Sequence, residues 1–452
     1  MGLSPGAHAA RLAAIQLLEA VLTGRRPLNA AFDEGNAGHG SAATLAELEV
    51  RDRAFARLLA ATTLRRLGQV DAVIGACMDK PLTPSAARVT AALRIGIAQL
   101  LFLDTAAHAA VDSSVALAKD KAPKLAGLVN AILRRVAREG TAMTEGHDAA
   151  KMNTPRWMWR TWVRTYGDET AAAIGNAHLA AHPPMDFTLR DAAGASDWAA
   201  RLVARVLPGG SLRRGGGGRV SDLAGYGDGA WWVQDAAAAL PARLLFGGLE
   251  RCGNATEGTA ALDLCAGVGG KTAQLAAAGL RVTAVDSSQQ RLATLRANLE
   301  RLGLGAQTIT GDGRTFRPAH PATAILLDAP CTATGTLRRR PDVAILKKQA
   351  DVTALAELQA ALLDAAAQSL APGGVLIYAV CSLQPEEGRA QVQRVLEERR
   401  PGKLQRLPIG GAEVPGLEPA VTADGDVQTL PCHMAEAGGV DGFFISRLVR
   451  PA

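Results

Sequence analysis

Two cysteines each follow an apolar segment that is typical of a buried β-strand. Cys331 lies in DAPCTATGTLRRRPD directly after AILL, and Cys381 lies in YAVCSLQPEEG after GGVLI. A helical stretch separates the two segments, so we expect adjacent parallel strands joined by a right-handed crossover. Both thiols would then reach the same edge of one sheet. The turns around them, which contain proline and glycine, favour reactive thiols over cysteines that act only as small hydrophobic residues.

A glycine-rich turn follows another predicted strand, in DLCAGVGGKT at 263–272. It is not a P-loop, because Cys265 stands where that motif needs a glycine five residues before Gly270. It is not a dinucleotide fingerprint either, because Thr272 stands three residues after Gly269. What remains is a tight turn whose backbone can approach a ligand closely.

Two acidic residues follow this turn in the sequence, after later predicted strands. Asp286 ends the predicted strand VTAVD, where an acid typically binds a ribose diol, and Asp312 follows in TGDGR. A diol acid without phosphate-binding machinery favours a nucleoside ligand such as S-adenosylmethionine over a dinucleotide. The alternative is an ordinary glycine-rich turn between a strand and a helix.

A thiol beside a methyl donor indicates methylation of a pyrimidine at carbon 5. That carbon is a poor nucleophile, and a thiolate that adds to carbon 6 makes the ring enamine-like. The carbon-5 proton must then leave before the thiol is eliminated. Asp328, the acid that precedes Cys331, can stabilise charge near N3 of the base. The base must be presented outside a stack.

The surrounding patterns predict how these residues are positioned. The length of 452 residues indicates two or three domains. Apolar residues at three- and four-residue spacing predict helices up to about residue 140 and further helices over 151–206. Residues 208–220, PGGSLRRGGGGRV, are predicted to form a loop or flexible connector. From about 258, short strands alternate with helices, which predicts a doubly wound parallel sheet.

Basic residues gather in two places. The formal net charge is +6, which permits a polyanionic partner, and residues 113–138 hold six cations against one acid. A solvated helix face and a nucleic-acid contact are equally good interpretations of that run. In TPRWMWRTWVRTYG, tryptophans alternate with arginines; base stacking is one interpretation, but helix spacing favours core positions.

Composition also excludes several classes. No cysteine pair forms CxxC and no histidine cluster accompanies the six cysteines, so we predict no metal site. Arg11 interrupts the first apolar segment, and no stretch reaches the length of a membrane span. Gly6 stands where a myristoylation motif needs serine or threonine. We expect reduced thiols and a cytoplasmic protein without membrane attachment.

Four motifs, in order and spacing, resemble those of the RNA cytosine-5 methyltransferases: DLCAGVGGKT, DAPCTATGTLRRRPD, YAVCSLQPEEG and DGFFISRLVR. RIGIAQLLFLD and GLVNAILRRV resemble the NusB-like RNA-binding domain that precedes the catalytic half in bacterial 16S ribosomal RNA enzymes. The resemblance implies an all-α NusB-like bundle at 1–145 and a connecting helical segment at 146–220. It also implies an α/β, Rossmann-like, S-adenosylmethionine-dependent class I methyltransferase domain at 221–452, with 16S ribosomal RNA as the partner.

The resemblance also implies roles for individual residues. Cys381 would be the nucleophile, Cys331 would assist release of the methylated RNA, and Lys271 and Asp328 would contact the target base. The S-adenosylmethionine site would comprise Cys265, Ala266, Gly267, Val268, Gly269, Gly270, Lys271, Asp286, Asp312 and Asp328. Three departures from the family pattern, Val268, Val380 and Gly388, leave the acids and thiols intact and bear on geometry and rate.

RNA contacts are expected from two basic groups. Arg338, Arg339 and Arg340 are placed to hold phosphates that flank the target base, the alternative being a solvated basic turn. The basic run adds Lys119, Lys121, Lys124, Arg134 and Arg135.

Two other functions are alternatives to an RNA cytosine-5 methyltransferase. A non-catalytic RNA-binding, assembly or antitermination factor is disfavoured because both cysteines and the diol acid are present. A DNA cytosine-5 methyltransferase, which would use the Pro-Cys cysteine as nucleophile, is disfavoured by YAVCS and by the helical domain. No obligate protein partner is predicted.

Overall fold

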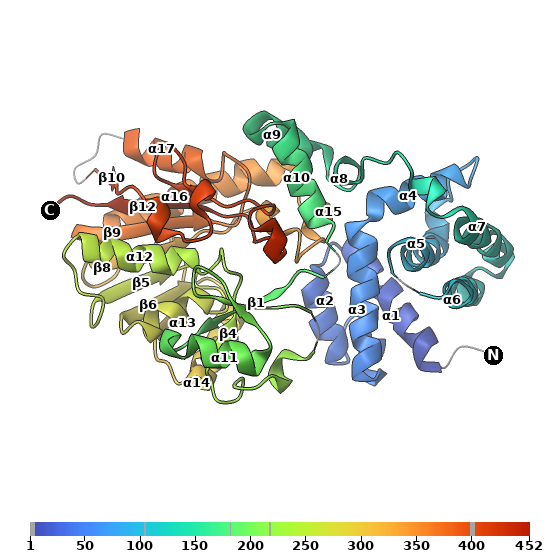
Figure 1. Cartoon of the computed structure of the whole chain (residues 1–452), viewed down its shortest axis with the longest axis horizontal. Coiled ribbons are helices and arrows are strands. Elements are labelled where there is room, and N and C mark those ends of the chain that lie inside the picture. Colours follow the sequence, from blue (N-terminus) through green and yellow to red (C-terminus); the bar gives the residue numbers. More distant parts are fainter. Residues whose placement is uncertain (1–4, 104, 181, 217, 398–402) are drawn as a thin grey trace. The chain divides into compact units, whose positions relative to one another are not determined.

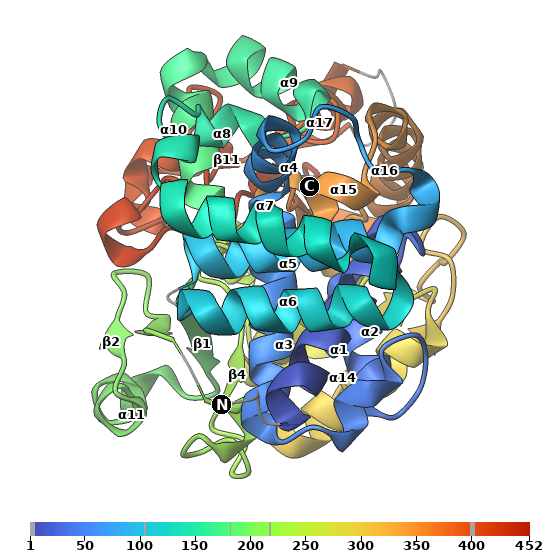
Figure 2. The same cartoon turned by 90° about the vertical axis from the view of Figure 1, so that its right-hand side faces the viewer.

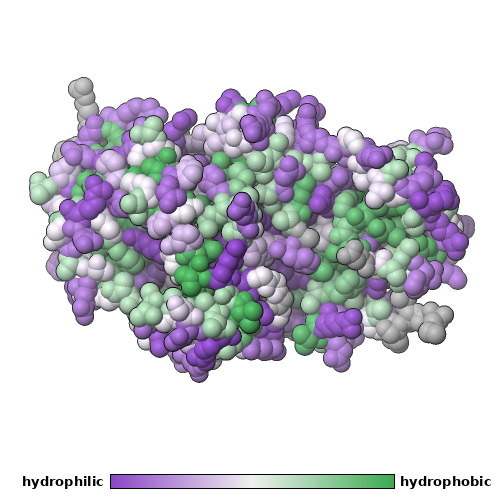
Figure 3. Space-filling model, in the orientation of Figure 1, coloured by the Kyte–Doolittle hydropathy of each residue, from purple (hydrophilic) through white to green (hydrophobic). Residues whose placement is uncertain are grey.

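The computed structural model describes residues 5–103, 105–180, 182–216, 218–397 and 403–452. The chain divides into two compact units. The first comprises Met1–Ala181 and Arg339–Lys348, and the second comprises His182–Arg338 and Gln349–Ala452. Figure 1 colours both along the sequence, and Figure 3 shows hydrophilic side chains on the surface of each.

The first unit is helical, as predicted. Its core is built from apolar residues at helical spacing, among them Ile15, Leu59 and Leu93, which are fully buried. Figure 2 shows α5, α6 and α7 of this bundle side by side. The helices are α1 (Pro5–Leu22), α2 (Leu28–Asn36), α3 (Val50–Arg65), α4 (Leu67–Ala76), α5 (Ala87–Phe102), α6 (Ala107–Lys121), α7 (Ala126–Glu139), α8 (Ala149–Met152), α9 (Arg156–Tyr166), α10 (Asp168–His178) and α15 (Val343–Leu346).

Gly96 on α5 explains how closely these helices pack. A Cβ at this position would lie 2.8 Å from the side chain of Leu133 on α7 and 2.9 Å from Ser114 Oγ on α6. Any larger residue would separate the three helices. The glycine in RIGIAQLL therefore serves packing of the bundle.

Helix α15 comes from the catalytic half of the sequence but packs in the helical unit. Ile345 and Leu346 contact its hydrophobic core. The Leu28 amide donates to Asp342 Oδ2 (3.2 Å), and Arg25 donates to the Leu346 carbonyl (2.7 Å). A segment that follows more than 150 residues of the second unit in the sequence, Arg339–Lys348, is thus one of its elements.

One described helical stretch, Pro84–Phe102, has the length and hydropathy of a membrane span. In the structure, 56% of it is buried, and Ile95 and Ile97 are core residues of the bundle. Packing in the helical core accounts for its apolar character.

The second unit begins with a small antiparallel sheet that was not predicted from the sequence. Its strand order is β2-β3-β1-β4, and β3 lies inside the segment 208–220 that was predicted to be a loop. That prediction is wrong for β3, because Arg213 is buried there and donates twice to the buried Asp186 carboxylate (both 2.6 Å). The elements are β1 (Met185–Leu189), α11 (Ala195–Leu202), β2 (Arg205–Val206), β3 (Leu212–Arg214) and β4 (Trp231–Val233).

The main sheet has eight strands in the order β10-β12-β9-β8-β5-β6-β7, with β11 paired to β12. Strands β5 to β9 are parallel, which confirms the doubly wound prediction, and β12 adds an antiparallel neighbour to β9. Its strands are β5 (Ala260–Leu264), β6 (Arg281–Asp286), β7 (Gln307–Thr310), β8 (Ala322–Asp328), β9 (Leu370–Val380), β10 (Gln405–Arg406), β11 (Val427–Gln428) and β12 (Phe444–Val449).

Helices cover both faces of this sheet, so alternate residues of each strand enter two different cores. Ala261 and Ile377 face α12 and α13, whereas Leu262 and Leu376 face α16 and α17. The covering helices are α12 (Leu240–Arg251), α13 (Gly270–Ala277), α14 (Gln289–Leu302), α16 (Gln349–Ser369) and α17 (Arg389–Glu397).

The compact units differ from the predicted boundaries at 145 and 220. Residues 146–180 pack with the helical bundle, and the remainder of the predicted connector joins the second unit. The buried Arg213–Asp186 pair and the pairing of β1 with β3 and β4 bind the later part to the second unit.

Candidate active site

The two predicted reactive cysteines are neighbours. Cys331 and Cys381 follow the adjacent parallel strands β8 and β9, and their Sγ atoms lie 3.4 Å apart. The strands stay paired to their ends, where the Ala329 amide donates to the Ala379 carbonyl (2.9 Å). The prediction that the two thiols, 50 residues apart in the sequence, meet at one edge of the sheet is confirmed.

The surroundings of Cys331 keep its thiol protonated. The hydrogen bond with Cys381, together with burial, raises the pKa of Cys331 well above its ordinary value. Cys331 is therefore a neutral thiol near neutral pH and can donate a hydrogen bond to Cys381 Sγ. Burial raises the pKa of Cys265 to about 12, so that third thiol is unreactive in this site.

Lys271 and Asp328 form an ion pair beside the thiols. Lys271 Nζ lies 2.7 Å from Asp328 Oδ2, and its side chain is only 11% exposed. Burial acts to lower the pKa of Lys271, but the charge and hydrogen bond of Asp328 and the proximity of Cys381 outweigh it and raise that pKa. The ammonium group also lies 5.2 Å from the ring centroid of Phe443. The site thus holds a fixed positive charge next to the Cys381 sulfur.

A buried carboxylate, Glu387, connects the two cysteine loops. Thr332, which follows Cys331, donates to it through both its amide (2.8 Å, to Oε1) and its hydroxyl. Ser382, which follows Cys381, donates to Oε2 (2.5 Å). Because one carboxylate accepts hydrogen bonds from the residues that follow both cysteines, it fixes the spacing of the two loops.

Further contacts hold Glu387 itself in place. Gln359 Nε2 on α16 donates to Oε1 (3.1 Å), and the Tyr378 hydroxyl donates to the Glu387 carbonyl (2.5 Å). Burial raises the pKa of Glu387, while its hydrogen bonds act in the opposite direction. No motif in the sequence singles out Glu387; its only signal is an acid six residues after the strand-end Cys381.

We expect Glu387→Ala to lower kcat for methyl transfer about tenfold or more with little change in KM for RNA. The substitution removes the charged acceptor that the buried hydroxyls of Thr332 and Ser382 share, at a cost of about 1–3 kcal/mol, and releases the cysteine loops. Glu387→Gln keeps the shape and an acceptor oxygen and should lose less. Steady-state kinetics below the unfolding temperature of both variants tests this. An Ala variant with wild-type kcat would exclude a positioning role.

The glycine-rich turn is hydrogen-bonded to Asp286 at the end of β6. Gly267 donates its amide to Asp286 Oδ2 (2.9 Å), and Ser288 donates to Oδ1 (2.8 Å). Gly269 has a φ of +92°, and a Cβ there would lie 2.6 Å from Leu295. Only glycine satisfies both conditions, so the turn can pass close to α14 before α13 begins.

A cavity of about 190 Å³ lies over these strand ends. It is lined by three predicted cofactor residues, Cys265, Asp286 and Asp312, and by Arg291 and Arg314. Arg314 pairs with Asp312 (2.6 Å) and, through its hydrogen bonds, lowers the pKa of that acid. Ala266 and Gly270 lie in the turn beside the cavity, and Val268 points outward, 52% exposed.

Asp263 is a further candidate that the sequence analysis missed. It is fully buried in β5, and Thr272 donates to its Oδ2 (2.6 Å). Its Oδ1 has no hydrogen-bond partner among the described residues, and burial raises its pKa to about 7. A buried carboxylate oxygen without a partner, beside the turn, matches the chemistry of a cationic or N–H group. The signal in the sequence was an acid inside an apolar strand.

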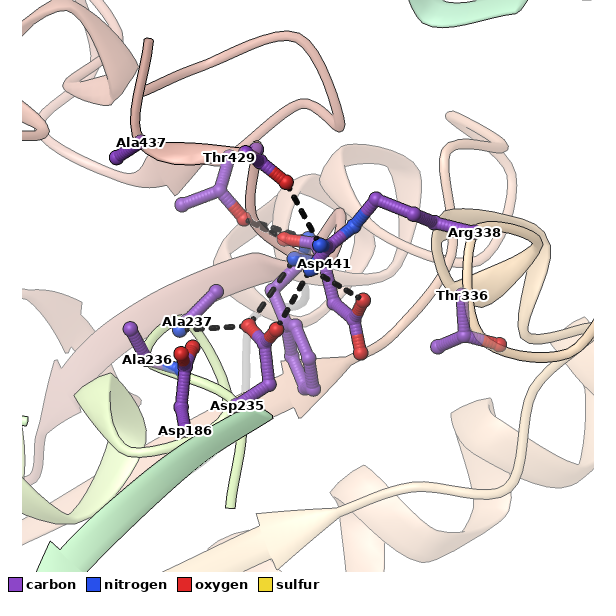
Figure 4. A network of polar contacts seen from close by, with 12 residues as sticks. Asp186, Asp235, Ala236, Ala237, Thr336, Arg338, Thr429, Ala437 and Asp441 are labelled. Atoms are coloured by element: carbon purple, nitrogen blue, oxygen red, sulfur yellow. Dashed lines mark hydrogen bonds and ion pairs between the residues drawn. The ribbon is translucent and has the colours of Figure 1, made fainter. Parts of the chain in front are cut away.

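The prediction that Arg338 holds RNA phosphate is not supported by its position. Its side chain is fully buried, and Figure 4 shows it reaching Asp235 and Asp441. Its guanidinium donates to Asp235 Oδ2 (2.9 Å), Asp441 Oδ1 (3.3 Å) and the Gly438 carbonyl (2.8 Å). Because two carboxylates already compensate its charge, Arg338 anchors the Cys331 loop to the segment before β12.

The other predicted RNA-binding residues lie in the helical unit. Arg340 is exposed and Arg339 is half-buried, next to α15. The basic run on α6 and α7 is exposed at Lys119, Lys121, Lys124, Arg134 and Arg135. Arg135 also pairs with Glu139 (3.0 Å), one residue beyond the run, which reduces its net charge.

Gly388, one of the three departures from the family pattern, lies against the ring of Phe444. A Cβ at this position would lie 2.8 Å from the Phe444 ring on β12, and Val380, paired with Phe444 across the sheet, is fully buried. A larger residue at 388 would require that ring to shift.

Among the described residues, no group of three or more His, Cys, Asp or Glu side chains is arranged to hold a metal ion.

The whole chain is similar to curated bacterial proteins named ribosomal RNA small subunit methyltransferase B. It is 35% identical to that of Pseudomonas putida over 98% of both chains. It is 32% identical to that of Escherichia coli O9:H4, over 88% of this chain and 91% of the relative. Residues 253–449 match the family described as 16S rRNA methyltransferase RsmB/F. The chain belongs to this family.

The rest of the RsmB/F chain matches known proteins as well. Residues 8–138 match the NusB family, which confirms the NusB-like prediction for the helical bundle. The crystal structure of PH0851 superposes with a TM-score of 0.73 at 20% identity, over 99% of this chain and 100% of that one. The structure of NSun6 from Pyrococcus horikoshii with SFG gives 0.53 at 19% identity, over 66% and 98%. These similarities support the fold.

As an RsmB/F methyltransferase, the protein uses S-adenosylmethionine as its methyl donor. The residues present fit this cofactor. The glycine turn begins at Cys265, which lines the cavity together with Asp286 at the end of β6, and Asp263 beneath has a buried oxygen without a partner. When bound, the cofactor supplies an electrophilic methyl group.

Proposed function

We propose that this protein methylates carbon 5 of a cytidine in 16S ribosomal RNA through a covalent adduct with Cys381. The observation that carries the proposal is the pair of thiols 3.4 Å apart, next to the Lys271–Asp328 ion pair. A methyltransferase acting on an exocyclic amine or a ribose hydroxyl needs no thiol, whereas carbon 5 must be activated by addition at carbon 6. We further propose that it acts in the cytoplasm.

Cys381 is the nucleophile in this mechanism. Its sulfur adds to carbon 6 of the extruded base, and the Lys271 ammonium lies close to that sulfur. Asp328, held by Lys271 at 2.7 Å, lies where it can contact the N3 side of the ring. Carbon 5 then carries the electron density needed to take a methyl group.

Cys331 assists release. After methylation, a base takes the carbon-5 proton, and the electron pair of that C–H bond re-forms the double bond between carbons 5 and 6. The bond from carbon 6 to Cys381 breaks in the same elimination, and the sulfur departs as a thiolate. The neutral thiol of Cys331, 3.4 Å away, donates a hydrogen bond to the departing sulfur and stabilises it. Glu387 and Arg338 keep the two loops at this distance and act as positioning residues.

Asp286 and the turn 265–270 bind the cofactor in this proposal. The Asp286 carboxylate accepts from Gly267 through Oδ2, and from Ser288 and Arg291 through Oδ1. Its remaining accepting capacity, on Oδ2, takes a ribose hydroxyl. Asp263 Oδ1 takes the amino group of the methionine part. Asp312, on the rim of the cavity, contacts the nucleoside.

The test is to incubate the protein with methyl-labelled S-adenosylmethionine and unmodified 16S ribosomal RNA, followed by nucleoside analysis. We expect label in 5-methylcytidine at one position of the RNA. Label in any other nucleoside would overturn the carbon-5 assignment. A wild-type protein that binds RNA but transfers no methyl group would favour the non-catalytic alternative.

A further inference from the structure

Helix α9 in the helical unit presents two different faces. Met158 and Trp162 are fully buried, and Trp162 packs on His178 of α10 with ring centroids 5.5 Å apart. The tryptophan-as-core interpretation is therefore confirmed for Trp162. The opposite stripe, at spacing i, i+3, i+4, i+7 and i+8, consists of Arg156, Trp159, Arg160, Val163 and Arg164. Trp159 is only partly buried, and the three arginines are exposed.

This stripe lines a cavity of about 400 Å³, a volume within the range of ligand-binding pockets. Trp159 and Val163 form apolar walls, while Lys151 and the three arginines provide positive charge. Asp168 is the one acid among the lining residues of the described chain. Arg156 and Arg160 form no hydrogen bond or ion pair through their side chains within the described residues.

Trp159 is only partly buried and lies among guanidinium groups, which is not the setting of a core tryptophan. A hydrophobic core does not place two arginines without carboxylate partners beside a tryptophan. Binding sites for single-stranded nucleic acid, in contrast, combine an aromatic ring that stacks on a base with cations that follow the phosphate backbone. Arg156 and Arg160 are one helical turn apart, about 6 Å along the axis, which suits successive phosphates of an extended strand.

We propose that the α9 pocket, defined by Lys151, Arg156, Trp159, Arg160 and Val163, binds an unpaired nucleotide of the substrate RNA. An unstacked base lies on the Trp159 ring, and Arg156 and Arg160 hold the phosphates on its two sides. This inference rests on the proposed RNA substrate but not on the cytosine-5 chemistry. It places a single-strand contact on α9, outside the basic run of α6 and α7.

The test measures equilibrium binding of an unstructured, fluorescently labelled oligoribonucleotide to the full chain, without S-adenosylmethionine, over a range of salt concentrations. We expect Trp159→Ala to weaken binding about tenfold with an unchanged salt dependence, and Trp159→Phe to retain most of the affinity. Arg156→Gln with Arg160→Gln should lower the slope of log K against log salt by about 1.4, the value for two phosphate contacts.

The matched control is Arg51→Gln with Lys80→Gln, which removes the same charge from exposed positions of the same unit. Circular dichroism and thermal unfolding establish that each variant is folded. An affinity of Trp159→Ala within twofold of wild type, or equal losses in the arginine pair and the control pair, would overturn the proposal. Binding of an acidic polypeptide with the same residue dependence, and no binding of RNA, would also overturn it in favour of a protein partner.

Methyl transfer is measured separately on 16S ribosomal RNA. We expect the α9 variants to raise KM for RNA and leave kcat unchanged. If wild type binds the oligonucleotide through α9 but transfers no methyl group, the proposed function fails and the pocket stands. If transfer proceeds and the α9 variants bind RNA normally, the pocket fails and the proposed function stands.

Discussion

Cys381→Ala is expected to abolish methyl transfer to 16S ribosomal RNA, with a loss of about 10³-fold or more. That loss corresponds to about 4 kcal/mol of transition-state stabilisation. Without the sulfur, nothing adds to carbon 6, and carbon 5 keeps the low nucleophilicity of the intact ring. The remaining groups, Lys271 and Asp328, still bind the base but cannot replace the covalent step. Transfer of labelled methyl groups under single-turnover conditions measures the effect.

Cys252→Ala is the matched control for this variant. Cys252 is a free, partly buried thiol of the same unit, at the end of α12, and packs against its hydrophobic core. Its replacement should leave transfer within about twofold of wild type. Substantial transfer by Cys381→Ala would refute the assignment of the nucleophile and would return Cys331 to consideration.

Cys331→Ala is expected to trap a covalent complex between protein and RNA. Addition through Cys381 and methylation proceed, but the departing sulfur loses the thiol that stabilises it at 3.4 Å. General acid assistance of this kind contributes about 10²-fold or more, so turnover should fall by that factor while the first methyl transfer persists. A denaturing gel should show protein and RNA migrating together only when S-adenosylmethionine is present.

The double variant, with alanine at both positions, separates the two roles. If Cys381 forms the bond, the trapped complex disappears in the double variant. If the complex persists without Cys381, another nucleophile is at work. Free release of methylated RNA by Cys331→Ala, at the wild-type rate, would remove Cys331 from the mechanism.

Much of the catalytic half could be predicted because its signals are local. Short apolar runs that end in Cys265, Asp286, Asp328 and Cys381 carry the period of buried strands, and their order requires parallel strands. Parallel strands end at one edge of a sheet, so residues at those ends meet whatever the details of packing. The thiol pair and the glycine turn followed from that rule alone.

Side-chain partners far apart in the sequence could not be predicted in this way. Arg338 belongs to a basic triplet that is typical of a phosphate contact, yet its carboxylates, Asp235 and Asp441, each lie 103 residues away and enclose it. Glu387 joins Thr332 and Ser382 across 55 and 5 residues, which no spacing rule reveals. Strand β3, in a glycine-rich segment, depends on Arg213 and the buried Asp186.

The sequence by itself thus determined the fold class, the NusB-like and methyltransferase halves, and the set of residues at the strand ends. Only the tertiary structure decided that Arg338 is an anchor, that α15 belongs to the helical unit, and that Trp162 is buried while Trp159 lines a cationic pocket. The physical reason is that periodicity specifies which face of an element is apolar, whereas the fate of a charge or an indole depends on which distant groups compensate it.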